Sequence, residues 1–98
     1  MSLRHLVLLK FNPGTPADAG EALAEGLREL PGLIPEIVDY RVGPDLGLSD
    51  GSWDFGISAD FATAADWATY RDHPEHQQRI RDLVLPITAE RASVQIQT

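Results

Sequence analysis

Apolar and polar residues alternate along four segments of the chain, and this spacing predicts four β-strands. The strands are expected at Leu3–Asn12, Glu36–Gly43, Trp53–Phe61 and Glu90–Thr98. The third segment alternates most cleanly, while the first is apolar in the middle of both faces. A strand of that kind is typical of the centre of a sheet, with helices on one side and another layer, such as a partner sheet, on the other.

The segment between the first two predicted strands has helical spacing. Thr15 is expected to cap this helix, with Pro16 as its first residue and Asp18 as the partner of a capping box. The helix should reach about Leu30, because Pro31-Gly32 is a strong stop signal. A stripe of alanine and leucine residues along it would be buried against the sheet.

The segment after the third strand predicts two helices rather than one. Thr63 and Asp66 repeat the capping pattern and open a short helix that carries Trp67 and Tyr70 on one face. That helix should break at Asp72-His73, since the residue before a proline avoids helical angles, and Pro74 should start the next one. The order β-α-β-β-α(α)-β predicts a single ferredoxin-like α+β domain over residues 1–98.

The composition of the chain limits the partners, cross-links and cellular location that can be expected. The 98 residues carry a net charge of −7, which disfavours nucleic acid and anionic membrane surfaces as partners. The chain has no cysteine, so disulfides and thiolate metal sites are excluded. The apolar run Leu6–Leu9 is too short for a signal sequence or a membrane span, and a cytoplasmic protein is expected.

The stretch from Tyr70 to His76 concentrates the side chains that can move a proton near neutral pH. A bend at Pro74 could direct Tyr70 and His76 into one cavity, which His5 of the first strand could complete. Such a pair suits proton abstraction beside a carbonyl, with imidazole as the base and the phenol as hydrogen-bond donor. The competing interpretation makes His76 a core histidine bonded to a carbonyl and Tyr70 a buried aromatic; His73 is expected to be a helix cap.

The chain resembles the stress-responsive A/B barrel (Dabb) family over nearly its whole length. The matching features are His5 in the run His-Leu-Val-Leu-Leu-Lys-Phe, Leu30 followed by Ile34-Pro35, Val42-Gly43, and Tyr70-x-x-His73-Pro74-x-His76. The resemblance implies a ferredoxin-like four-stranded antiparallel sheet with helices on one face, which dimerises into a barrel. It also implies catalytic roles for Tyr70 and His76, as in plant polyketide cyclases of the family, with His5 in the same pocket.

Three functions remain open from the sequence. The first is a homodimer that binds a small, partly apolar carbonyl compound between sheet and helices, acting, if catalytic, as a cofactor-free cyclase or isomerase. The second is a non-catalytic stress or assembly protein, and the third is a cofactor-free monooxygenase, by analogy of fold alone. The residues expected to line the cavity beside the catalytic pair are His5, Val7, Leu9, Ile57 and Trp67.

Two further features leave alternatives open. The loop Gly43–Ser52 is long for a small domain and fits either a lid or a plain surface excursion. Its carboxylates Asp45 and Asp50 could hold a hard cation or simply be solvated, and no metal site or cofactor is expected. The aromatic residues Trp53, Phe55, Phe61 and Trp67 are expected mainly in the core.

Overall fold

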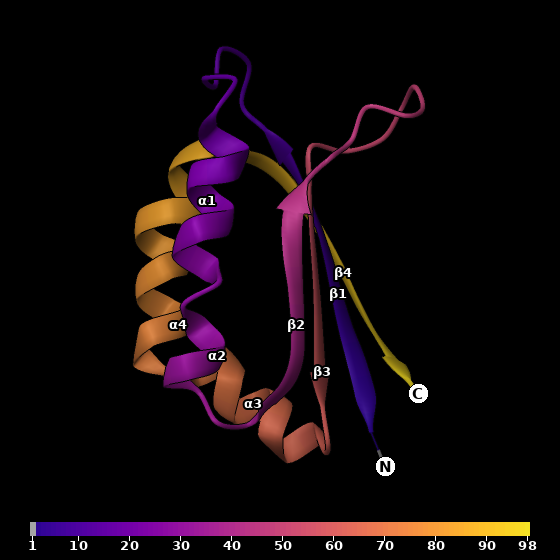
Figure 1. Ribbon diagram of the computed structural model, residues 1–98, viewed down its shortest axis with the longest axis vertical. Coiled ribbons are helices and arrows are strands. Elements are labelled where there is room, and N and C mark those ends of the chain that lie inside the picture. Colours follow the sequence, from indigo (N-terminus) through magenta and orange to yellow (C-terminus); the bar gives the residue numbers. More distant parts are fainter. Residues whose placement is uncertain (1) are drawn as a thin grey trace.

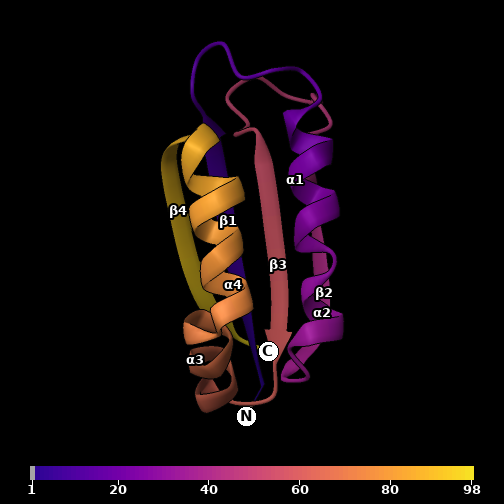
Figure 2. The same cartoon turned by 90° about the vertical axis from the view of Figure 1, so that its left-hand side faces the viewer.

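A four-stranded antiparallel sheet forms one layer of the protein, and the helices cover one of its two faces (Figures 1 and 2). The computed structural model describes residues 2–98. The strands are β1 (Leu3–Phe11), β2 (Ile37–Pro44), β3 (Phe55–Phe61) and β4 (Thr88–Gln97), in the spatial order β2-β3-β1-β4. This is the expected ferredoxin-like α+β arrangement, with β1 and β3 in the centre and β2 and β4 at the edges.

The helical layer consists of four α-helices and two short turns of other helix types. The elements are α1 (Ala19–Leu27), α2 (Leu30–Leu33), α3 (Ala64–Asp72), α4 (Pro74–Arg79), the π-helical turn η1 (Ile80–Val84) and the 3-10 turn η2 (Leu85–Ile87). Within the described residues, no helix has the length and apolar character needed to cross a membrane.

The first helix differs from its prediction at both ends. It begins at Ala19, and the hydroxyl of Thr15 donates to the carbonyl of Asn12 (2.6 Å) instead of capping the helix. It ends at Leu27, and Pro31 lies in the first turn of the separate short helix α2. Proline lacks a backbone N–H, but an N–H in the first turn of a helix has no partner within that helix. Pro31 is therefore tolerated as the second residue of α2.

The side chains at the start of the second strand face differently from the prediction, because β2 contains a bulge. The register between β2 and β3 shifts between Ile37 and Asp39. Val38 is therefore 68% exposed, although it was expected to share a face with Tyr40 and Val42, while Ile37 is buried. An extra residue in one strand reverses the side-chain alternation on either side of it, which accounts for the change.

The core lies between the inner face of the sheet and the helices. Val7 and Leu9 of β1 meet Leu23 and Leu27 of α1 there, all of them buried. Phe55 and Phe61 are buried in it as expected, but Trp53 precedes β3 and lies outside the buried set, with Lys10 over its ring at 5.6 Å. Burial of large apolar side chains of this kind contributes about 1.5–3 kcal/mol each.

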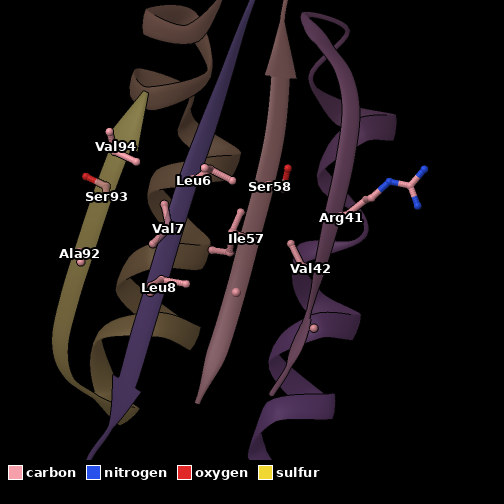
Figure 3. Close-up of a pocket in the computed structure, with 12 residues that line it drawn as sticks. Leu6, Val7, Leu8, Arg41, Val42, Ile57, Ser58, Ala92, Ser93 and Val94 are labelled. Atoms are coloured by element: carbon pink, nitrogen blue, oxygen red, sulfur yellow. The ribbon is translucent and has the colours of Figure 1, made fainter. Parts of the chain in front are cut away.

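The middle of the outer face of the sheet is apolar, and within residues 2–98 no second layer covers it. Leu8, Val94 and Ile96 are 50%, 52% and 43% exposed. A hollow of about 620 Å³ lies on this face. Figure 3 shows Leu6, Leu8 and Val94 among the residues that line it. The edge strand β4 thus turns its apolar residues outward, and its polar residues face the helices.

The loop between β2 and β3 extends past the sheet on the side away from the helices (Figure 1). Its base is closed by a backbone hydrogen bond from Asp45 N–H to the carbonyl of Asp54 (2.9 Å). Gly47 and Gly51 have positive φ angles of 75° and 83°, which glycine adopts readily. Leu46 and Leu48 in this loop are more than four-fifths exposed (82% and 85%).

Helix α1 approaches β2 so closely that only glycine fits at position 20. A Cβ atom at Gly20 would lie 2.8 Å from Cβ of Pro44, a rigid ring that cannot rotate away. We expect Gly20→Ala to destabilise the protein by about 1–3 kcal/mol in urea unfolding, because overpacking outweighs the gain in helix propensity. The control Gly32→Ala meets nothing within 4 Å and should be neutral or stabilising by up to about 1 kcal/mol. Equal stability of the two variants would contradict the close packing.

Candidate functional site

A cavity of about 310 Å³ lies between the inner face of the sheet and the helices α3 and α4. The structure brings together around it all of the residues that the sequence suggested for a site. These are His5, Val7, Leu9, Ile57, Trp67, Tyr70 and His76. The β2–β3 loop contributes no residue to its lining.

The break between α3 and α4 positions the central pair of the cavity. His73 has an extended backbone (φ −63°, ψ 134°), and its Nδ1 accepts a hydrogen bond from the backbone N–H of Glu75 (3.1 Å). The expected capping role of His73 is therefore confirmed. The break brings the rings of Tyr70 and His76 together, with centroids 4.1 Å apart and planes inclined at 38°.

His76 is held in one tautomer. Its Nδ1 lies 3.0 Å from the carbonyl oxygen of Arg71. A carbonyl can only accept, so Nδ1–H donates, and Nε2 of the neutral ring carries a free lone pair. Burial lowers the pKa of His76, the charge of Arg91 lowers it further, and the hydrogen bond to Arg71 partly opposes them. The ring is therefore neutral at physiological pH, with a free basic nitrogen.

His5 adopts the opposite tautomer. The side-chain amide of Gln95 is placed with Nε2 2.8 Å from Nδ1 of His5, so the amide N–H donates to this ring nitrogen. The proton of neutral His5 is then on Nε2. Burial lowers the pKa of His5, and the neighbouring His76 and Arg91 lower it further. The cavity thus holds one histidine that can accept a proton and one that can donate a hydrogen bond.

Aromatic side chains form much of the remaining wall. The ring of His5 lies edge-on to those of Trp67 and Tyr70, at centroid distances of 5.9 and 6.2 Å. Burial raises the pKa of Tyr70 and that of Tyr40, so both phenols stay protonated. The indole Nε1 of Trp67 is buried without a hydrogen-bond partner among residues 2–98. Unpaired buried polar groups of this kind are costly, and a bound ligand could satisfy them.

Sequence reasoning missed the polar part of the lining. Arg91, Ser93 and Gln95 of β4 line the cavity, as do Tyr40 of β2 and Arg71 of α3. The three β4 residues pair in register with Leu9, Val7 and His5, and so share their face of the sheet. The alternation of apolar and polar residues along β4 was visible in the sequence. The polar residues of such a strand are ordinarily expected to face solvent, so they were not placed in the cavity.

Metal binding has no obvious site in the part of the chain that the structure describes. Residues 2–98 contain no group of three histidine, aspartate or glutamate side chains placed to hold a metal ion. His73 uses its Nδ1 as a helix cap, and the carboxylate of Asp45 accepts from the backbone N–H of Gly47 (2.9 Å).

The strand order and the single helical layer define a ferredoxin-like α+β protein. The chain belongs to the stress responsive A/B barrel (Dabb) domain family, whose model matches residues 3–97. An uncharacterised protein of Streptomyces coelicolor is 32% identical to it over 77 residues, which cover 76% of this chain and 79% of the relative.

Solved structures show the same fold. A dimeric ferredoxin-like protein from Thermobifida fusca superposes with a TM-score of 0.91 at 35% identity, covering 100% of this chain and 92% of its own. The hydroxynitrile lyase from Passiflora edulis superposes with a TM-score of 0.81, covering 97% of this chain and 91% of its own. Its identity is only 15%, so this likeness concerns the fold alone.

The position of Arg91 predicts a linked change at both histidines. Arg91→Gln removes a positive charge that lowers the pKa of His5 and of His76. Both pKa values should rise, as measured by an NMR titration of the imidazole Cε1 protons. The control Arg81→Gln removes an equal charge from an exposed arginine outside the cavity, which pairs with Asp82 at 3.2 Å, and should leave both unchanged. If neither histidine responds to Arg91→Gln, the guanidinium does not act on this cavity.

Proposed function

We propose that this protein binds a small, partly apolar carbonyl compound in the cavity and catalyses cofactor-free proton transfer on it. The observation that carries the proposal is the contact of Tyr70 with His76, whose Nε2 is free while Nδ1 is engaged by the Arg71 carbonyl. A cavity of about 310 Å³ falls within the size range of small-molecule sites.

The chemistry would begin with a proton on the carbon beside the ligand's carbonyl. Nε2 of His76 takes this proton, and the electron pair moves onto the carbonyl oxygen as an enolate. The hydroxyl of Tyr70 or Nε2–H of His5 can donate a hydrogen bond to that oxygen. In a conjugated enolate, return of the proton from His76 to the far carbon gives isomerisation. Attack of the enolate carbon on a second carbonyl of the same molecule gives cyclisation, and the proton on His76 passes to the alkoxide that forms.

The apolar part of the cavity wall supports this chemistry. Val7, Leu9 and Ile57 line the sheet side of the cavity, and Trp67 lines the helix side. Exclusion of water by such side chains strengthens the hydrogen bonds made to a developing enolate. The same burial that lowers the pKa of His76 keeps it unprotonated and able to act as a base.

Hydrogen–deuterium exchange tests the proposed reaction without knowledge of the product. Phenylacetone in D₂O serves as the probe, and NMR follows the loss of its protons beside the carbonyl. We expect His76→Gln to reduce the protein-catalysed exchange about 100-fold or more, since a positioned base contributes roughly 10²–10⁴-fold. The rate should fall on acidification with a midpoint below the ordinary histidine pKa, because the pKa of His76 is lowered.

Two further variants sharpen the experiment. Tyr70→Phe keeps the ring packed against His76 and should slow exchange without abolishing it. Arg81→Gln, which is outside the cavity, should exchange at the wild-type rate. Exchange that is unaffected by His76→Gln would remove this residue as the base.

We also propose that two copies of this chain pair through the outer faces of their sheets. The support is an apolar face with Leu8, Val94 and Ile96 exposed, together with the dimeric state named for the Thermobifida fusca protein. Pairing would cover these side chains and give β1 apolar contacts on both of its faces, as its sequence pattern requires. Each copy would keep its own cavity, since that lies on the other side of the sheet.

A single charge should separate the two copies. Val94→Asp places a carboxylate in the centre of the proposed interface, and sedimentation velocity at micromolar concentration should then show a monomer. The control Leu85→Asp changes another exposed apolar residue, 61% exposed, in η2 of the helical layer, and should leave a dimer. A wild-type monomer, or a Val94→Asp dimer, would contradict pairing through this face.

A further inference from the structure

The charges around the cavity differ sharply from those of the chain as a whole. Acidic residues outnumber basic ones by 15 to 8. Nevertheless, none of the residues that line the cavity is an aspartate or a glutamate, and its two charged residues are arginines, Arg71 and Arg91. A positive site in an acidic protein is an arrangement that favours an anionic ligand locally.

The two arginines are not equivalent. Arg71 is neutralised by Asp72, which accepts hydrogen bonds from both Nε and Nη2 at 2.8 and 2.9 Å, and its guanidinium lies 5.0 Å from the ring centre of Trp67. Arg91 has no ion pair and no hydrogen bond from its guanidinium within residues 2–98. The carboxylate next to it in sequence, Glu90, is 3.5 Å from Nζ of Lys10.

Arg91 occupies the same face of the sheet as the reactive part of the cavity. It pairs in register with Leu9, while Ser93 and Gln95 pair with Val7 and His5. Its charge acts on both histidines, since it contributes to the lowered pKa of each. Ser93, two residues along the same face of β4, lines the same cavity and adds a hydroxyl to it.

We propose that the ligand is a small aromatic or otherwise planar monocarboxylate, and that Arg91 binds its carboxylate, with the Ser93 hydroxyl as a second donor. This inference rests on the proposed function, because it assigns the ligand class of the same cavity. The guanidinium fork of arginine matches the two oxygens of a carboxylate. The rings of His5, Trp67 and Tyr70 provide the walls that a planar body would contact.

The charge count favours a carboxylate over a phosphate ester. One unpaired guanidinium balances one negative charge, whereas a phosphate monoester carries about 1.5–2 at neutral pH. The net charge of −7 would repel the more highly charged anion more strongly. A monoanion thus fits both the single free arginine and the acidic surface around it.

Matched probes of nearly the same shape test this assignment. Benzoate, benzamide and phenyl phosphate are titrated into the full chain, and binding is followed through the NMR signals of His5, His76 and Trp67. We expect benzoate to bind about tenfold more tightly than benzamide, as for one charge-assisted pair at a partly open site. Phenyl phosphate should bind more weakly than benzoate.

Variants of Arg91 complete the experiment. Arg91→Gln should remove the preference for benzoate over benzamide, while Arg91→Lys should retain part of it. Arg81→Gln, which makes the same change in net charge, should keep the full preference. Binding of benzoate should also raise the pKa of both histidines in the wild type, because the carboxylate offsets the charge of Arg91.

The outcomes separate this inference from the proposal on which it rests. Equal binding of benzoate and benzamide, with no effect of Arg91→Gln, overturns the carboxylate assignment and leaves a neutral-ligand cavity. Tighter binding of phenyl phosphate overturns it in favour of a dianion. If no probe shifts the signals of the cavity residues, the small-molecule cavity and the carboxylate assignment are both overturned.

Discussion

The conformation of a single residue, His73, determines how the helical layer meets the sheet. A residue before proline avoids helical angles, so the chain leaves the helix at His73 and starts a new one at Pro74. Without this break, Tyr70 and His76 would lie six residues apart on one continuous helix and point in different directions. The break places their rings 4.1 Å apart, and Arg79 then fixes α4 against α1 by donating to the carbonyl of Gly26 (2.9 Å).

The two histidines of the cavity show how backbone and edge-strand groups prepare a site before any ligand is present. A carbonyl exposed by the helix break holds the proton of His76 on Nδ1, and an amide from the edge strand holds that of His5 on Nε2. Burial and the charge of Arg91 keep both rings neutral. The cavity therefore holds a hydrogen-bond acceptor, Nε2 of His76, and a donor, Nε2–H of His5, while both rings are neutral.

Local patterns in the sequence were sufficient to predict the four strands, the helix break and the proximity of Tyr70 to His76. Each of these depends on residues near one another in the chain, such as Pro74 at the helix break. The ends of α1 were predicted wrongly, since Thr15 and Asp18 form an apparent capping box whose hydroxyl is instead used by the preceding turn. Val38 was assigned to the wrong face because the sequence gives no sign of the bulge between Ile37 and Asp39. Arg91 and Gln95 could not be assigned to the cavity, as this needs the pairing of β4 with β1, a contact between opposite ends of the chain.

Successive residues of β4 point alternately to the two faces of the sheet. Arg91, Ser93 and Gln95 face the cavity, whereas Ala92, Val94 and Ile96 belong to the opposite side of the sheet. Substitutions at odd-numbered positions can therefore alter what the cavity recognises without disturbing the surface available for self-association, and those at even-numbered positions can do the reverse. A strand built in this way keeps the two sets of side chains on separate faces, so that either set can change while the other stays the same.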